Sequence, residues 1–137
     1  MQTWIGKLLY KQFNFPVTVI MPQSYGDKSK LTKEIHRHYR EPLSKPAYRT
    51  GTYAFAKEIL DAGAWWDSLW AGIDKIKGKP FLIFWGLKDK FILPKSLDKW
   101  IEKLPDGKVI RFENAGHFVQ EEEPQKMVSE MLIFFPQ

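Results

Sequence analysis

The sequence predicts an α/β protein in which a helical region, residues 1–77, precedes a β-α-β-α unit with parallel strands, residues 78–137. Three observations lead to this class. Apolar residues recur at helical spacing between prolines and glycines in the first part. The second part contains a five-residue run that is apolar at every position, which is typical of a strand buried on both faces of a parallel sheet. It also shows the order strand, helix, strand, helix, and strands joined through a helix run parallel with a right-handed crossover.

Residues 1–77 are predicted to form short helices separated by breaks. Helical spacing of apolar residues is found in four stretches, which are residues 4–9, 35–39, 53–60 and 65–73. Ser29 or Thr32 is suited to cap the second of these helices, and a turn at Gly63 ends the third. Residues 17–21 fit a strand or a helix equally well, and no other strand is expected in this region.

A β-α-β-α pattern fills the rest of the chain. Strands are expected at residues 81–85 and 108–112. Between them, a helix from Pro94 carries an apolar stripe with the spacing i, i+3, i+4, i+7, made of Leu97, Trp100, Ile101 and Leu104. Pro124 opens the last helix, because proline is favoured at the first helical position. Two strands alone leave open edges, so we expect either that residues 1–77 cover this surface or that the sheet is wider than this chain supplies.

The composition is that of a folded globular domain and excludes several kinds of site. The chain is 44% hydrophobic and 27% charged, which is too apolar for intrinsic disorder. The absence of cysteine excludes a disulfide scaffold, a cysteine nucleophile and a cysteine-ligated metal. His36 and His38 would not share a helix face, so no metal site is expected, and nothing implies a cofactor.

The charge and the hydropathy pattern also limit the partners. The formal charge is +5, but basic residues are interleaved with acidic ones, so a solvated basic face explains the charge better than a nucleic-acid site. No stretch approaches the roughly 18 apolar residues of a membrane span, and the N-terminus lacks the pattern of a signal peptide. We therefore expect no nucleic-acid partner, no membrane and a cytoplasmic location.

Polar side chains follow both predicted strands where each strand ends. Asp89 lies just past the first strand and His117 just past the second. Ligands of open α/β sheets bind at the carboxyl ends of strands, so both side chains are expected at one edge of the sheet. A carboxylate that accepts the ring N–H of a histidine fixes its tautomer and prepares it to act as a general base.

Each residue also has a purely structural interpretation. Asp89 lies in a turn, where its carboxylate would bond to backbone N–H groups, and His117 would be a buried loop histidine. Because the two residues fall at adjacent strand ends, the functional interpretation is the better one.

Two runs of residues at these strand ends resemble a known family. They are Phe84-Trp85-Gly86-Leu87-Lys88-Asp89-Lys90-Phe91 and Asn114-Ala115-Gly116-His117-Phe118-Val119-Gln120-Glu121-Glu122. They are similar to the C-terminal end of an α/β-hydrolase, most of all to the haloalkane dehalogenase branch, with epoxide hydrolases close by. The resemblance implies that Asp89 is the triad acid and His117 the catalytic base. It further implies a partial α/β-hydrolase fold, with residues 1–77 as a helical cap-like region and residues 78–137 as the C-terminal β-α-β-α part of the core.

The sequence departs from this family at the nucleophile. No serine has the G-x-S-x-G context of a nucleophile elbow, and Asp67 lies in a helical pattern. The His-Gly oxyanion loop and the first strands of the sheet are also absent, and a family member has roughly twice this length. We therefore expect a chain that carries the acid and the base but not the nucleophile, and that is inactive alone.

Several alternatives for the function stay open. An aspartate nucleophile from another part of the protein would suit a small haloalkane or an epoxide, whereas a serine would suit an ester. A non-catalytic, truncated or interaction module is the other interpretation.

Two further expectations concern binding. Dehalogenases bind halide through tryptophan N–H groups, so the resemblance suggests Trp65, Trp66 and Trp70 as substrate-binding residues, although helical spacing also fits a core role. The doubly apolar strand with an open edge suggests self-association, and the alternative is a compact monomer in which residues 1–77 cover that edge.

Overall fold

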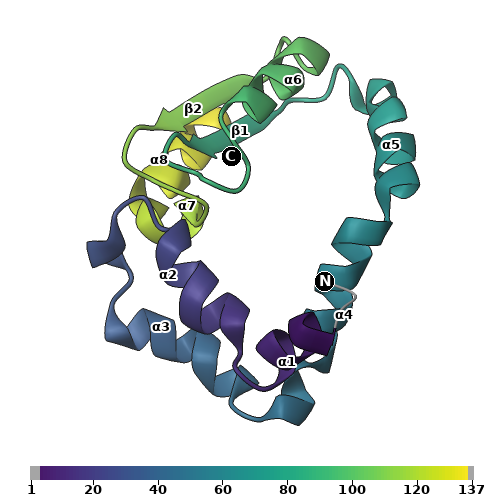
Figure 1. Cartoon of the computed structure of the whole chain (residues 1–137). Coiled ribbons are helices and arrows are strands. Elements are labelled where there is room, and N and C mark those ends of the chain that lie inside the picture. The colour runs from purple at the N-terminus through teal and green to yellow at the C-terminus, as the bar shows by residue number, and fades with distance from the viewer. Residues whose placement is uncertain (1–3, 136–137) are drawn as a thin grey trace. The chain divides into compact units, whose positions relative to one another are not determined.

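The computed structural model describes residues 4–135 of the chain (Figure 1). The helical elements and strands follow in the order α1 (Trp4–Lys11), η1 (Pro16–Ile20), α2 (Met21–Ser24), η2 (Lys28–Lys30), α3 (Lys33–Arg40), η3 (Glu41–Leu43), η4 (Pro46–Arg49), α4 (Thr50–Asp61), α5 (Gly63–Ala71), η5 (Ile73–Ile76), β1 (Leu82–Gly86), α6 (Lys95–Lys103), β2 (Lys108–Phe112), α7 (Val119–Glu122) and α8 (Pro124–Phe134). Of the helices in this described part, none is long and apolar enough to cross a membrane.

The described chain forms two compact units. One comprises residues 4–22 and 32–72, and the other comprises residues 23–31 and 73–135. The second unit is therefore discontinuous in sequence, because residues 23–31 group with the strands and not with the neighbouring helices. The functional division into 1–77 and 78–137 stays a prediction.

The first unit is helical, as its sequence predicts. Residues 17–21 belong to a helix, since Pro16 opens the π-helical turn η1 and α2 continues it. Thr32 caps α3 by accepting the backbone N–H of Ile35 at 3.2 Å. In the described residues 4–77 there is no strand. Of the two alternatives left open for residues 17–21, the helical one is confirmed.

A buried arginine joins several segments of this helical unit. The Arg49 guanidinium donates from Nε to the carbonyl of Leu43 at 2.6 Å and from Nη2 to that of Ser44 at 2.7 Å. Its Nη1 donates to the carbonyls of Lys11 and Gln12 at 2.9 and 2.8 Å. These carbonyls lie at the end of α1 and around η3, so one side chain supplies hydrogen-bond donors to backbone carbonyls of both segments.

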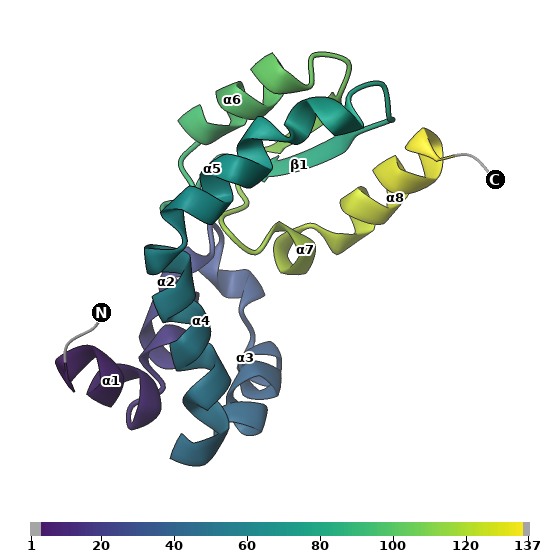
Figure 2. The same cartoon turned by 90° about the vertical axis from the view of Figure 1, so that its right-hand side faces the viewer.

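The second unit is built on a two-stranded parallel sheet, as predicted. Leu82 of β1 pairs with Lys108 of β2, and the register continues to Gly86 and Phe112. Helix α6 lies on one side of this sheet and α8 on the other (Figure 2). The buried core of the unit is formed by Phe112, Ala115 and Val119, with Phe84, Ile110 and Met127 packed against them. Because the two strands are parallel, their carboxyl ends lie at the same edge of the sheet. The further expectation of self-association stays a prediction.

The segment after β2 contains two helices. α7 ends at Glu122, and Glu123 adopts φ −135° and ψ 43°, outside the helical region, before Pro124 begins α8. Proline disfavours helical backbone in the residue that precedes it, which explains the break. Because α7 ends at Glu122 and does not continue into α8, the Glu122 side chain reaches the backbone of the loop that carries His117.

Candidate active site

The loop after β1 holds the Asp89 carboxylate rigidly. Its Oδ1 accepts the backbone N–H groups of Phe91 and Ile92 at 2.8 and 3.0 Å. Its Oδ2 lies 2.8 Å from Nδ1 of His117. The two strand ends therefore bring Asp89 and His117 within hydrogen-bonding distance, and the predicted proximity is confirmed. The turn interpretation of Asp89 is also correct, because one carboxylate oxygen serves the turn and the other serves the histidine.

The two partners of this pair differ in exposure. The Asp89 side chain is only 9% exposed, whereas that of His117 is 37% exposed. The carboxylate is thus fixed below the surface and the imidazole is accessible. A carboxylate at Nδ1 favours the tautomer with the proton on Nδ1, which leaves Nε2 as an acceptor. This geometry leaves Nε2 able to accept a proton from a group beside it.

The loop that carries His117 is packed backbone against backbone on both sides. A Cβ added to Gly86, at the end of β1, would lie 2.6 Å from the carbonyl oxygen of Ala115. A Cβ added to Gly26 would lie 2.6 Å from the carbonyl carbon of Ala115 and from the nitrogen of Gly116. Side chains at these glycines would separate the layers. The His117 loop is therefore enclosed between β1 and residues 23–31.

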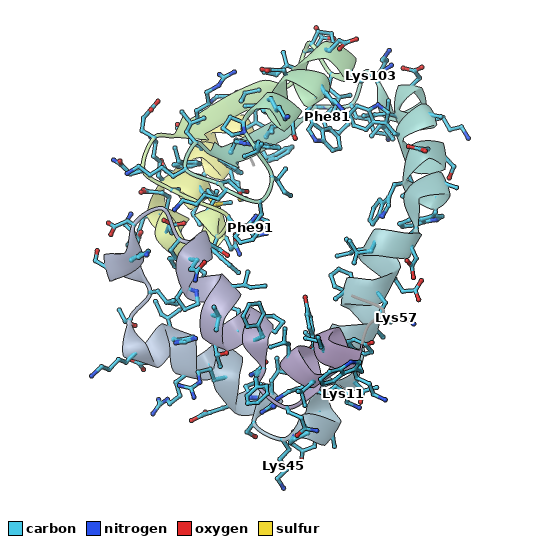
Figure 3. The ribbon with its side chains drawn as sticks, viewed as in Figure 1. Lys11, Lys45, Lys57, Phe81, Phe91 and Lys103 are labelled. Carbon is cyan, nitrogen blue, oxygen red and sulfur yellow. The ribbon has the colours of Figure 1, made fainter. Side chains whose placement is uncertain are left out.

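Aromatic rings surround the imidazole. The Phe91 and Phe118 rings lie 5.9 and 5.5 Å from that of His117, both in edge-on geometry, and Phe91 is labelled in Figure 3. The Phe118 ring is stacked on the buried Tyr25 at 5.3 Å. A cavity of about 170 Å³ adjoins the pair and is lined by Phe84, Trp85, Gly86, Asp89, Ile92, Gly116, His117 and Val119. Its lining combines apolar side chains with the polar Asp89–His117 pair.

The three tryptophans suggested for substrate binding lie on α5, in the helical unit. Trp65 and Trp66 are 55% and 46% exposed, and their rings contact each other at 4.5 Å. Their part in substrate binding stays a prediction, as does that of Trp70. Sequence reasoning overlooked Trp85, which lines the cavity beside His117. Because Trp85 belongs to an uninterrupted apolar strand, its sequence position did not indicate that it lines a cavity.

Other features of the helical unit lie apart from this chemistry. A larger cavity of about 710 Å³ is lined only by residues of that unit, among them Lys33, His36 and Arg37. His36 Nε2 lies 2.7 Å from the carbonyl oxygen of Val17, a contact that orients its ring. Among residues 4–135, no group of three His, Cys, Asp or Glu side chains is placed to hold a metal ion.

Comparison with known proteins identifies the fold family of the chain. The family described as alpha/beta hydrolase fold matches residues 2–124. Haloalkane dehalogenase 2 of Mycobacterium tuberculosis is 29% identical over 121 residues, which cover 87% of this chain and 42% of that protein. Cis-3-alkyl-4-alkyloxetan-2-one decarboxylase of Shewanella oneidensis is 28% identical over 138 residues, covering 96% of this chain and 43% of that protein. The chain spans less than half the length of these curated relatives.

Solved structures show the same fold. The haloalkane dehalogenase of Bradyrhizobium elkani matches with a TM-score of 0.80 and 21% identity, over 95% of this chain and 46% of that one. A putative ancestral haloalkane dehalogenase matches with a TM-score of 0.77 and 24% identity, over 92% and 45%. The likeness in structure and the match over residues 2–124 lead to the same result: the chain belongs to the α/β-hydrolase fold family.

Proposed function

We propose that this chain supplies the acid and the base of a haloalkane dehalogenase-like hydrolase that works through a covalent intermediate. The observation that supports it is the 2.8 Å contact between Asp89 Oδ2 and His117 Nδ1 at the carboxyl ends of two neighbouring parallel strands. The nucleophile and the oxyanion donors belong to a part of the hydrolase outside this sequence. Residues 1–77 act as a helical cap, with Trp65, Trp66 and Trp70 as candidates for substrate contacts.

The proposed chemistry has two steps. An aspartate nucleophile displaces halide from an alkyl carbon and forms an alkyl ester. His117 then takes a proton from water at Nε2, and the resulting hydroxide attacks the ester carbonyl. The ester C–O bond breaks, and the His117 imidazolium returns its proton to the departing alkoxide, which leaves as the alcohol. Loss of the remaining carboxylic-acid proton to solvent restores the aspartate nucleophile. Asp89 holds the imidazole in place and stabilises its cationic form.

The reaction class depends on the nucleophile. With aspartate, the substrate is a small haloalkane or an epoxide, and with serine it is an ester. The relatives favour the first, because the curated match in Mycobacterium tuberculosis is named a haloalkane dehalogenase. The decarboxylase match adds oxetan-2-ones as a competing substrate class.

A substrate panel on the protein at its full natural length tests the proposal. It contains a bromoalkane, styrene oxide, a nitrophenyl ester and an alkyl oxetan-2-one. We expect turnover of the bromoalkane. In His117→Ala, hydrolysis of the covalent alkyl ester on the nucleophile should be slower by about 10²–10⁴-fold. Mass spectrometry of this variant should show the protein carrying one alkyl group. His38→Ala is the matched control, since His38 is an exposed residue of α3 outside the site.

Three outcomes would contradict the proposal. They are full activity in His117→Ala, turnover of the ester or oxetan-2-one alone, and no turnover at all, which favours the non-catalytic alternative. A protein of these 137 residues alone should hydrolyse none of the four substrates.

A further inference from the structure

We infer that Glu122 is the positioning residue of the general base: its buried carboxylate fixes the His117 loop against residues 23–31. Only the expected effect on catalysis rests on the proposed function of His117; the structural role of Glu122 does not. Glu122 is 2% exposed, although it lies in the acidic run of residues 121–123. A buried carboxylate requires partners, so its surroundings indicate what it does.

Among residues 4–135, the hydrogen bonds that reach this carboxylate come from three backbone N–H groups. Oε1 accepts the N–H of Gly116 at 2.7 Å. Oε2 accepts the N–H groups of Gly26 and Asp27, both at 2.9 Å. Gly116 directly precedes His117, and Gly26 and Asp27 belong to the distant segment that covers the loop. One side chain therefore holds two layers of backbone together.

The same two layers are joined through His117 itself. The His117 N–H donates to the carbonyl of Ser24 at 2.8 Å, in the covering segment. The backbone of His117 is thus fixed from both sides, by Ser24 directly and by Glu122 through Gly116. A shift of the Gly116 peptide would move the imidazole relative to the Asp89 carboxylate, which is held separately by its own turn.

The site requires a carboxylate and not an amide. Three N–H donors converge on the two oxygens, and a glutamine has an oxygen at one position and an NH₂ donor at the other. Glu122→Gln therefore places a donor against at least one backbone N–H while it keeps the volume of the side chain. Lys30 stabilises the arrangement from outside, because its ammonium donates to the Glu122 carbonyl at 2.5 Å and to Glu123 Oε1 at 2.6 Å.

Nuclear magnetic resonance on the full-length protein tests the inference without any substrate. The variants are Glu122→Gln and, as the matched control, Glu113→Gln, which removes one exposed carboxylate near the same loop. We expect amide exchange at Gly116, Gly26 and Asp27 to accelerate about 10- to 100-fold in Glu122→Gln. The low-field Nδ1–H resonance of His117 should weaken or shift. Exchange at Ile110 of β2 should not change, which shows that the fold persists.

Kinetics add a second readout. If the proposed function holds, Glu122→Gln should lower kcat about 10-fold or more and leave KM within about twofold, because the base and not substrate binding is displaced. If the protein turns over no substrate, the exchange and Nδ1–H measurements still decide the inference.

The result that overturns it is an unchanged Nδ1–H resonance with unchanged exchange at Gly116. Uniform acceleration at every amide, Ile110 included, also overturns it, since Glu122 would then serve global stability alone. Should Glu122→Gln fail to fold, Glu122→Asp provides the same measurements, because it keeps the charge and shortens the reach by one methylene.

Discussion

Replacing Gly26 by alanine tests the close backbone contact beside the His117 loop. The added Cβ would meet the Asn114 carbonyl oxygen most closely. It would also lie 2.6 Å from the Ala115 carbonyl carbon and the Gly116 nitrogen, whereas real Cβ atoms essentially never come within 3.0 Å of such atoms. The layers must therefore separate by at least about 0.4 Å. That shift lengthens the 2.9 Å bond from Gly26 to Glu122 beyond the usual limit of about 3.2 Å.

The magnitude follows from these two effects. Overpacking costs about 1–3 kcal/mol, and loss of a hydrogen bond to a buried carboxylate costs about 1.5–3 kcal/mol. We expect the free energy of unfolding to fall by about 3 kcal/mol or more, and Tm by roughly 6–12 °C. Both are measured by urea and thermal denaturation followed by circular dichroism.

The control for this variant is Gly51→Ala in α4, where an added Cβ meets nothing within 4 Å. There the change should stabilise the protein by about 0.5 kcal/mol through helix propensity. The reasoning is refuted if Gly26→Ala loses less than about 1 kcal/mol, the lower bound of the overpacking cost.

Two further predictions concern charged side chains. Arg49→Lys should lower the free energy of unfolding by about 2–4 kcal/mol, because an ammonium does not reproduce the four hydrogen bonds of the guanidinium to separate carbonyls. Urea denaturation measures this free energy, and a loss below about 0.5 kcal/mol would count against the role assigned to the guanidinium. The hydrogen bond from the Ser29 hydroxyl, more than any other contact, holds the pKa of Asp27 below its usual value. A lowered folded pKa stabilises the protein above the unfolded pKa of about 3.9 and ceases to do so as pH falls through the folded value. Asp27→Asn should therefore destabilise the protein fully above the unfolded pKa and progressively less as pH falls below it, in parallel denaturation series. A difference in stability that does not vary with pH would disprove this.

The parts of the fold that sequence reasoning predicted are those with strong local patterns. The doubly apolar run became β1, and the alternating order of elements led to the parallel pairing with β2. The apolar stripe after Pro94 became α6. Asp89 and His117 were found because strand ends are predictable once the strands are. In each case neighbouring residues carry the information.

The parts that were missed depend on contacts between distant residues. Glu122 lies in an acidic run, residues 121–123, which is typical of a solvated surface, and only the position of Gly26 shows that its carboxylate is buried among N–H donors. Arg49 looked like one more basic residue of a positively charged chain. Nothing within a few residues of either one indicates burial, so periodicity and spacing do not detect them.

The discontinuity of the strand-containing unit has a consequence for folding kinetics. Glu122 contacts Gly26 across 96 residues of sequence. Forming this contact closes a chain loop that includes the helices of the other unit. Closing so long a loop loses chain entropy that the contact recovers only afterwards, so pairing of β1 with β2 is expected to precede it. The geometry around His117 is therefore expected to be completed late in folding, and a partly folded chain with its sheet already formed would still lack an ordered Asp89–His117 pair.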